Sequence, residues 1–308
     1  MDVRHDGTLP SPLEPLFERL ERIYGAGALN GIVNSMREPK RVGFVINRLV
    51  SGHDRPPGEP LAGVDGCYSV PAAERERLLE HPAVLTGACY PMNPSSVMAA
   101  RALAVTGSME VLDLAAAPGG KTLILAMDME NRGRIAAVEP VRGRFHRMRA
   151  NLSRLGVTNV QYYQADGRGI GRKVPERFDR VLLDAPCSSE ARIRLQDPAS
   201  YAHWKPRKVK ETSRKQRGLI RSAYQALKRG GEMIYCTCAF SPEENELVVD
   251  HLLRAEPEAV LLSLSGPGVP GLTSWNGRPL EPHLARCRRV LPDEVFDGFF
   301  IARIAKGP

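Results

Sequence analysis

The sequence predicts an α/β protein, with a mostly parallel, doubly wound sheet that carries helices on both faces and follows a small α+β domain. Apolar runs of strand length alternate with helical segments from about residue 90 onward, which is typical of a parallel sheet with crossover helices. Several runs end in an acidic residue or a cysteine, and a glycine turn follows the first. The 308 residues suffice for two domains, which we expect to be a small N-terminal domain that contacts a polyanionic partner, residues 1–88, and a large domain, residues 89–308.

The elements of the large domain follow from this alternation. Apolar runs predict five strands, at Glu110–Ala115, Ile135–Glu139, Val160–Asp166, Phe178–Ala185 and Glu232–Cys238. The segments between them predict three helices, at Gly120–Asn131, Arg142–Leu155 and Lys208–Leu227. In a sheet of this kind, ligands bind at the carboxyl ends of the strands.

Two elements are expected at the end of the chain. A helix after the fifth strand should begin with a capping box, in which Ser241 is the cap, Pro242 takes the first position and Glu244 completes the box. The tail, Val295–Ile304, is expected to be an antiparallel strand at the edge of the sheet. In the small domain, helical spacing of apolar residues predicts a helix over 12–25.

Composition bounds the class of protein. Lys and Arg number 43 against 35 Asp and Glu, so the net charge of +8 favours a polyanionic partner. The six cysteines are sparse and unpatterned, which favours a reducing cytoplasm over a disulfide framework. The N-terminus has no signal-peptide stretch, and no apolar run is long enough to span a bilayer. No pattern of histidines and cysteines matches a metal site, so we expect no metal. We also expect no membrane association and a monomer.

A glycine turn after the first large-domain strand predicts a cofactor loop. Asp113 ends the strand, and Pro118-Gly119-Gly120 turns the chain into a helix. Glycines let a ligand approach the backbone, and the helix N-terminus offers free N–H groups to an anionic group.

Acidic residues end the next two strands. Glu139 is placed to hold a ribose diol, and Asp166 to accept a hydrogen bond from an adenine amino group. Any one acid could merely end a strand or cap a helix. Three acids in register with a glycine turn, counting Asp113, suit an adenosine that carries a cationic sulfonium.

A P-loop is the rival interpretation of the same segment. Ala115–Thr122 is one residue away from Gly-x-x-x-x-Gly-Lys-Thr, and the strand ending in Asp184 could then hold magnesium. The first loop glycine is missing, however, and this interpretation leaves Glu139, Asp166 and the cysteines of the neighbouring strands without a role.

Two cysteines, Cys187 and Cys238, end neighbouring predicted strands, so their thiols can converge over one ligand. Addition of a thiolate to carbon 6 of a pyrimidine gives an enamine, which makes carbon 5 nucleophilic toward a methyl donor. Asp184 is placed to stabilise the charge that develops at ring nitrogen 3. Removal of the carbon 5 proton then expels the thiol, and the second cysteine could assist that elimination.

The other four cysteines have no predicted catalytic role. Cys236 is expected to point to the opposite face of its strand from Cys238, and a Cys-x-Cys metal site there lacks two further ligands. The remaining three are interpreted as small buried apolar residues: Cys67, Cys89 and Cys287.

Five motifs are together specific for one family. Asp113–Thr122 and Glu139–Arg144 match a cofactor motif and the strand that follows it. Asp184–Ser188 and Tyr235–Asn245 match two cysteine motifs, and Asp297–Phe300 matches a closing strand. On these residues the chain resembles the Sun/Fmu (RsmB/NOP-type) family of RNA cytosine-5 methyltransferases along nearly its whole length.

The resemblance implies a Rossmann-like class I methyltransferase fold that uses S-adenosyl-L-methionine and acts on RNA. It assigns Cys238 as the nucleophile and Cys187 as the cysteine that aids product release. The expected cofactor ligands are Ala115, Ala116, Ala117, Pro118, Gly119, Gly120, Lys121, Glu139, Arg144, Asp166 and Asp184. The family usually has a glycine after Cys187-Ser188, where this chain has Ser189-Glu190.

A basic run next to the catalytic strands predicts RNA phosphate contacts. Residues 205–230 hold ten Lys and Arg and one acid, Glu211. The alternative without a binding role is a helix face that is simply exposed to solvent. The residues expected to contact RNA are Lys205, Lys208, Lys210, Arg214 and Arg217. Nearby, Tyr201 could stack on a base, and Trp204 could do so or serve as a packing anchor.

These inferences lead to one prediction of function. We expect an RNA cytosine-5 methyltransferase that acts on ribosomal RNA through a covalent cysteine–cytosine intermediate. A tRNA substrate is the nearer alternative. A P-loop ATPase and a non-catalytic RNA-binding protein are the more distant ones.

Overall fold

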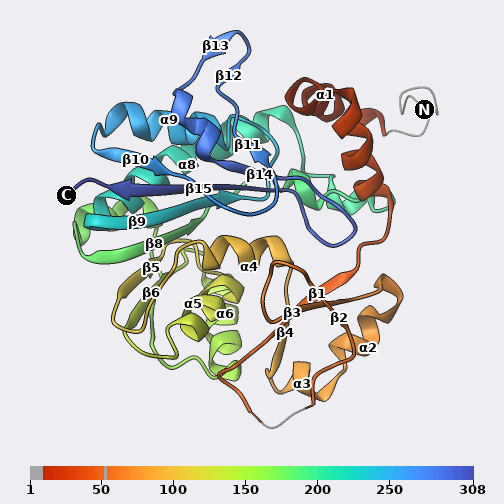
Figure 1. The fold of residues 1–308 in the computed structure, drawn as a ribbon, viewed down its shortest axis with the longest axis vertical. Helices are drawn as coiled ribbons and strands as arrows, with labels where there is room; N and C mark the ends of the chain where they lie inside the picture. The colour runs from red at the N-terminus through yellow and green to blue at the C-terminus, as the bar shows by residue number, and fades with distance from the viewer. Residues whose placement is uncertain (1–9, 52–53) are drawn as a thin grey trace.

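The computed structural model describes residues 10–51 and 54–308, and it consists of a large mixed sheet with helices on both faces and a smaller antiparallel sheet (Figure 1). The large sheet has nine strands in the order β11-β14-β15-β9-β8-β5-β6-β7, and β10 also pairs with β15. Its parallel strands are β5 Glu110–Asp113, β6 Arg134–Val138, β7 Val160–Tyr163, β8 Phe178–Asp184 and β9 Leu227–Thr237. All five predicted strands and their parallel arrangement are therefore confirmed.

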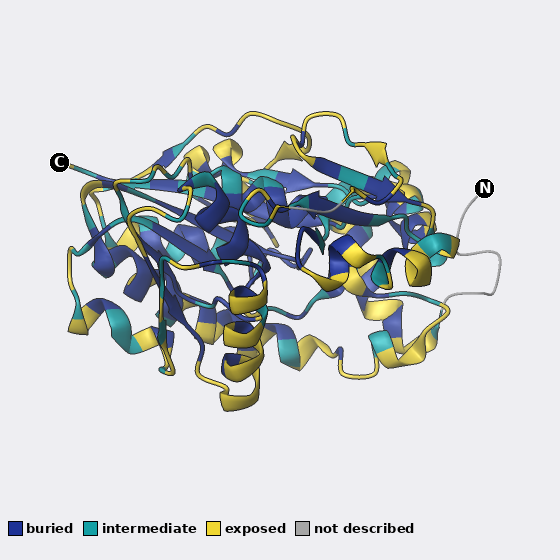
Figure 2. Cartoon of the chain, turned by 90° about the horizontal axis from the view of Figure 1, so that it is seen from below, coloured by how far each residue is buried: buried dark blue, intermediate teal, exposed yellow. Residues whose placement is uncertain are grey.

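Helices cover both faces of this sheet. One face carries α4 Pro94–Arg101, α5 Gly120–Asp128 and α6 Arg142–Arg154. The other carries α7 Ile170–Lys173, α8 Pro206–Ala226 and α9 Glu246–Ala255. Figure 2 shows the strands buried between exposed outer helix surfaces. The alternation of side chains along β8 explains this double burial, because Leu182 joins one apolar cluster while Val181 and Leu183 join the other.

Antiparallel strands complete the sheet beyond β9. They are β10 Ala259–Leu262, β11 Val269–Pro270, β14 Arg288–Val290 and β15 Phe299–Lys306. The tail strand β15 is antiparallel, as expected, but its predicted place at the sheet edge is wrong. It lies between β9 and the short strands β10 and β14, whose three or four residues carry little sequence signal.

The predicted capping box is also wrong. Helix α9 begins at Glu246, and its N-cap Asn245 makes no side-chain cap hydrogen bond. The Ser241 hydroxyl donates instead to Glu190, and the Glu244 carboxylate accepts hydrogen bonds from the Cys187 loop and from α8. Because Ser241 and Glu244 make these hydrogen bonds to distant segments, neither side chain caps the helix.

The small sheet has the antiparallel order β2-β3-β1-β4. Its strands are β1 Val42–Ile46, β2 Glu59–Pro60, β3 Cys67–Val70 and β4 Cys89–Pro91. The helices of this region are α1 Glu14–Arg37, α2 Arg75–Leu79 and α3 Pro82–Leu85. Helix α1 runs well past the predicted residues 12–25 and kinks at Gly25, which has φ +77°. The sheet includes β4, which follows residue 88, and the domain boundary there stays a prediction.

A buried amide joins the small sheet to the large one. Asn47, just after β1, is 1% exposed, and its Nδ2 donates to the carbonyl of Gly87 (2.8 Å) and to that of Leu155 (2.9 Å) at the end of α6. Arg154 of α6 reaches back and donates to the carbonyl of Val84 in α3. These contacts connect the two sheets through backbone acceptors.

The remaining elements are short. A two-stranded ribbon pairs β12 Ser274–Trp275 with β13 Arg278–Pro279. The 3-10 helices are Ser11–Leu13, Ala72–Glu74, Gly167–Gly169, Glu190–Arg192, Pro198–Ser200 and Pro282–Arg286.

A fully buried ion pair ties α9 to the antiparallel part of the sheet. Arg289 of β14 is 1% exposed, and it donates from Nε to Glu246 Oε1 at 2.6 Å and from Nη2 to Glu246 Oε2. Its Nη1 donates to the Tyr24 hydroxyl of α1 and to the carbonyl of Phe240, each at 2.8 Å. One guanidinium thus ties three other segments to β14.

We predict that Glu246→Gln lowers the free energy of unfolding by about 3–5 kcal/mol, because it leaves the Arg289 charge buried without its counter-charge. The matched control is Glu211→Gln, which removes an exposed ion pair to Arg207 within α8 and should cost no more than about 0.5 kcal/mol. Urea denaturation of the three proteins measures both values. Equal small losses in the two variants would contradict the prediction.

Candidate active site

A cavity of about 410 Å³ lies at the carboxyl ends of the parallel strands. The sheet order reverses between β5 and β8, and the cavity lies at this reversal, where doubly wound sheets bind ligands. Its lining residues include Ala115, Ala117, Pro118, Glu139, Arg144, Asp166, Asp184, Cys187 and Cys238. The structure therefore brings together most of the predicted cofactor ligands, both cysteines and Asp184.

The glycine turn contributes to two adjoining cavities. A second cavity of about 190 Å³ shares Ala115, Ala117, Pro118 and Asp184 with the first, and it is also lined by Ala116, Gly120 and Lys121. Gly119 lines neither cavity. It has φ +106°, and a Cβ there would lie 3.0 Å from the Leu152 side chain, so its place in the motif follows from backbone conformation and packing.

The two predicted nucleoside acids lie in the cavity wall with partners of their own. Glu139 is 1% exposed; its Oε1 accepts from the Val141 N–H at 2.9 Å, and its Oε2 lies 3.3 Å from Arg144 Nη1. Asp166 Oδ1 accepts from the Arg168 N–H at 2.9 Å, and hydrogen bonds from that arginine lower the Asp166 pKa. These backbone and arginine partners hold both carboxylates in a fixed orientation.

Asp113 is buried beneath the smaller cavity. Its Oδ2 accepts from the Thr122 hydroxyl at 2.7 Å, while its Oδ1 is buried without a hydrogen-bond partner among the described residues. Burial raises the Asp113 pKa to about 7. An acceptor of this kind at the wall of a cavity is available to a donor on a ligand.

Lys121 orients Asp184. Its Nζ donates to Asp184 Oδ2 at 2.6 Å and to the Ser96 hydroxyl at 3.1 Å. Burial lowers the Lys121 pKa, but the Asp184 carboxylate more than offsets that effect, and the net pKa is raised. The lysine is therefore held as a cation beside the acid that we expect to face the substrate, a link that the sequence reasoning missed.

The two thiols converge as predicted. Cys187 Sγ and Cys238 Sγ lie 3.3 Å apart, and both line the larger cavity. The hydrogen bond from the Cys187 thiol, helped by the Arg192 guanidinium, outweighs burial and lowers the Cys238 pKa to about 7. The same contact and burial raise the Cys187 pKa. The lowered pKa favours Cys238 as the thiolate of the pair and Cys187 as its hydrogen-bond donor.

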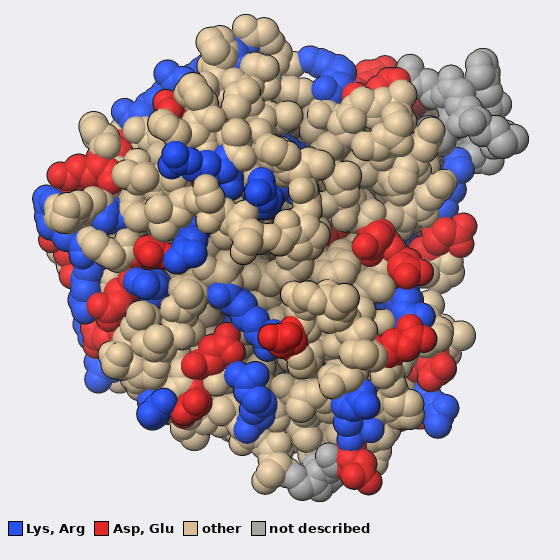
Figure 3. Space-filling model, in the orientation of Figure 1, with Lys and Arg blue, Asp and Glu red and all other residues tan. Residues whose placement is uncertain are grey.

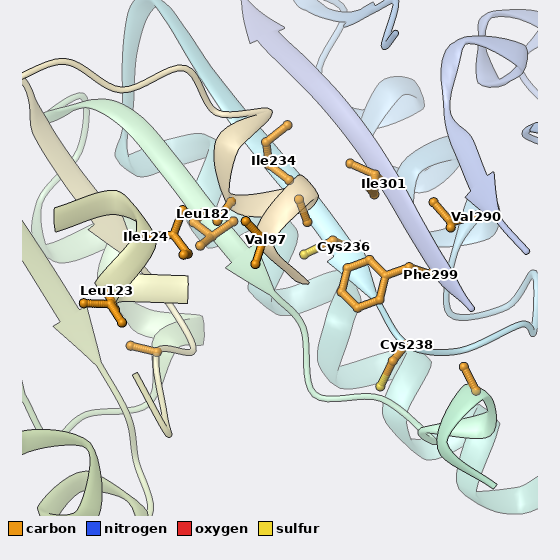
Figure 4. Close-up of a cluster of buried hydrophobic side chains, with 14 of the residues drawn as sticks. Val97, Leu123, Ile124, Leu182, Ile234, Cys236, Cys238, Val290, Phe299 and Ile301 are labelled. Atoms are coloured by element: carbon orange, nitrogen blue, oxygen red, sulfur yellow. The ribbon is translucent and has the colours of Figure 1, made fainter. Parts of the chain in front are cut away.

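The expectation for Cys236 is wrong. Residues two apart on a strand share a face, and Figure 4 shows the Cys236 and Cys238 sulfurs on the same side of β9, in the cluster that contains Phe299. The Cys236 thiol lies 3.7 Å from Asp184 Oδ1, and burial raises its pKa well above the ordinary value. It is a neutral neighbour of the site.

Glu190 anchors the loop of the nucleophile, and sequence reasoning did not assign it a role. Its side chain is fully buried and accepts from the backbone N–H groups of Phe240 and Ser241, each at 2.8 Å, and from Trp204 Nε1 at 3.0 Å. Trp204 is therefore a packing anchor. The preceding Ser189 has φ +60°, a left-handed conformation that explains why the family usually has glycine here. That departure was the one signal that marked this segment.

The basic run begins just before α8 and continues along its exposed face. Gln216 of α8 donates to the carbonyl of Pro186, and Lys215 lines the larger cavity, so the helix adjoins the site. The predicted phosphate contacts are Lys205, Lys208, Lys210, Arg214 and Arg217. None of these side chains makes an ion pair with another described residue, and all are exposed except Lys208, which is partly buried. Their role in RNA binding stays a prediction.

The fold and the site together define a class of protein. A parallel sheet with this strand order, and an acid-lined cavity at its reversal, form the Rossmann-like class I methyltransferase fold. The chain belongs to the 16S rRNA methyltransferase RsmB/F family, because the sequence model of that family matches residues 100–305. The resemblance drawn from the motifs is thereby confirmed, and the P-loop interpretation is wrong.

Individual relatives agree with this family. The chain is 40% identical over 228 residues to ribosomal RNA small subunit methyltransferase F of Escherichia coli (strain SMS-3-5), a match that covers 72% of this chain and 46% of the relative. The chain thus spans about half the length of the curated relatives that it matches. A methyltransferase homolog protein from Pyrococcus horikoshii has a TM-score of 0.79 and 32% identity, with coverage of 94% of this chain and 93% of that one. NSun6 from the same organism, solved with SFG, has a TM-score of 0.74 at 24% identity over 97% of this chain and 98% of that one, and shares the fold.

Within residues 10–51 and 54–308, no group of three or more His, Cys, Asp or Glu side chains is arranged to hold a metal ion. No helix in the same part of the chain has the length and apolar character needed to cross a membrane. The predicted monomeric state and cytoplasmic location stay predictions.

We predict that alkylation of Cys238 by iodoacetamide accelerates as pH rises through about 7, because the thiolate is the reactive form. Cys187→Ala removes the hydrogen-bond donor and should move the midpoint up toward about 8.5, the value of an ordinary thiol. Mass spectrometry of the Cys238 peptide reads the rate, and Cys287→Ala, at a distant buried cysteine, should leave the midpoint unchanged. A wild-type midpoint near 8.5 that Cys187→Ala does not move would contradict the assignment.

Proposed function

We propose that the chain transfers a methyl group from S-adenosyl-L-methionine to carbon 5 of a cytosine in ribosomal RNA, through a covalent bond between Cys238 and the base. The pair of thiols, 3.3 Å apart in a cavity that also contains Asp184, is the observation that carries the proposal. Family membership supports the ribosomal substrate.

The residues present fit the cofactor. Glu139 would hold the ribose, Asp166 the adenine amino group, and the orphaned Asp113 acceptor a cationic amino group beside the glycine turn. Arg144, at the start of α6, donates to the Ala117 carbonyl and lies 3.3 Å from Glu139, so it would form the side of the cofactor cavity next to the ribose. The cofactor supplies an electrophilic methyl group when bound.

The protein's own residues would prepare and release the base. Cys238 adds to carbon 6 as a thiolate, and the electron pair of the carbon 5–carbon 6 double bond moves into the ring, toward nitrogen 3. Asp184, oriented by Lys121, faces that nitrogen and would pass it the proton that neutralises its developing negative charge. After carbon 5 has been methylated, water takes its proton, the electron pair of that carbon–hydrogen bond restores the carbon 5–carbon 6 double bond, and the Cys238 thiolate leaves carbon 6. The Cys187 thiol, 3.3 Å from Cys238, assists this step by donating its proton to the departing thiolate. The target base must leave its stack to reach the thiol.

The nucleoside wall can be tested without catalysis. Glu139→Gln should weaken S-adenosyl-L-methionine binding by about 1–3 kcal/mol, because a charged acceptor is lost from a buried position. The control Glu130→Gln changes an exposed acid paired with Arg132 and should leave affinity unaltered. Isothermal calorimetry on the purified proteins measures the difference. Equal affinities in wild type and Glu139→Gln would remove Glu139 from the cofactor site.

The two cysteines should give opposite phenotypes. Cys238→Ser should abolish methylation and form no adduct, since the nucleophile is absent. Cys187→Ser should trap the enzyme on methylated RNA, because release is impaired. A denaturing gel with 16S ribosomal RNA and cofactor should show a shifted, nuclease-sensitive band for Cys187→Ser alone, and Cys287→Ala should behave as wild type. A band for Cys238→Ser would reverse the roles, and full activity in both variants would end the covalent mechanism.

A further inference from the structure

A second large hollow lies away from the active site. It has a volume of about 430 Å³ and shares no lining residue with either active-site cavity. The β2–β3 loop, the end of α4, the β10–β11 loop and strands β14 and β15 enclose it. Figure 3 shows this face of the molecule, with Lys and Arg side chains over β14 and beside α4. A hollow of this size has room for a ligand group.

Three arginines line the hollow, against one acid. Arg303 is paired with Glu232, at 2.6 Å between Nη2 and Oε2. Arg101 donates to the carbonyl of Asp65, the acid that lines the hollow, and its Nε lies 3.9 Å from an Asp128 carboxylate oxygen. Two of the guanidiniums therefore have acceptors within the chain.

Arg288 is the exception. It makes no ion pair and no side-chain hydrogen bond with another described residue, and its Nε is buried without an acceptor. Strand geometry explains its direction: Arg289 points into the buried pair with Glu246, so Arg288, like Val290, faces α4. A buried Nε–H without an acceptor is costly, and an anion in the hollow that accepts from it would remove that cost.

We propose that this hollow binds a phosphate group, with Arg288 as its main ligand and Arg101 beside it. Ser263 and Ser265 of the β10–β11 loop line the same hollow and offer hydroxyl donors. Guanidinium and hydroxyl donors around an open hollow are the chemistry that recognises a phosphate oxyanion. The phosphate belongs either to the backbone of the RNA substrate, which rests on the proposed function, or to a small phosphate-bearing ligand.

The first experiment tests whether inorganic phosphate binds at Arg288 in the absence of RNA. The probe is the arginine Nε–H spectrum of nitrogen-15-labelled full-length protein, titrated with inorganic phosphate and, separately, with chloride at matched ionic strength. Arg288→Gln identifies the Arg288 resonance by its loss. We expect that resonance to move saturably with phosphate and not with chloride. A response that is unsaturable, or equal for the two anions, overturns the site, whatever the protein does with RNA.

The second experiment separates the two sources. The slope of log affinity for 16S ribosomal RNA against log salt should fall by about 0.7–0.9 in Arg288→Gln if the hollow holds a backbone phosphate. The matched control Arg75→Gln changes an exposed arginine of α2 that has no ion pair to a described residue. An unchanged slope together with a saturable phosphate response assigns the hollow to a small phosphate-bearing ligand.

A reference variant keeps the two proposals distinguishable. Replacing Lys208, Lys210, Arg214 and Arg217 of α8 with Gln should flatten the RNA salt dependence several-fold more than Arg288→Gln does. If this variant leaves the slope unchanged, the predicted RNA surface on α8 fails. The phosphate titration of Arg288 then still decides the hollow on its own.

Discussion

The register of β8 against β9 sets the geometry of the site. Asp184, the last residue of β8, lies opposite Cys236 of β9, and the Ala185 N–H donates to the Cys236 carbonyl at 2.9 Å. Because the strands are parallel, both cysteine loops leave the sheet at the same edge. The pairing continues into these loops, where the Ala191 N–H donates to the Cys238 carbonyl at 3.1 Å. A slip of one residue would turn Asp184 and Cys236 to opposite faces and separate the acid from the thiols.

Buried carboxylates do in the loops what strand pairing does in the sheet. Glu190 lies in the Cys187 loop and holds the backbone that follows Cys238. Glu244 lies after Cys238 and holds the backbone N–H of Ser188, next to Cys187, at 2.9 Å. Each loop therefore supplies the acceptor that fixes the other. Such reciprocal, fully satisfied anchors allow catalytic groups to lie on open loops and still keep a defined geometry.

Much of this arrangement could be predicted from the sequence, and most of the failures have a common cause. The parallel strands and their helices follow from apolar periodicity, and the acids at the strand ends follow from the strands. Ser241 and Glu244 differ from expectation because their hydrogen-bond partners come from distant segments. Cys236 differs for another reason, since the alternation of a strand already places it on the same face as Cys238. Glu190, Arg192 and the Lys121–Asp184 link carry no periodic signal at all. Local patterns define elements, but partners in irregular loops are defined by the fold.

The buried Asn47 has a consequence for how the molecule meets a large ligand. Its amide is shared between the end of α3 and the end of α6, so the small sheet cannot rotate about the large one without exposing or orphaning these carbonyl groups. These hydrogen bonds, together with the one from Arg154 to the Val84 carbonyl, oppose a hinge motion between the two sheets. For a macromolecule that contacts both sheets, the distance between the small sheet and the thiols would then be constant. That distance would determine which part of the macromolecule reaches the thiols.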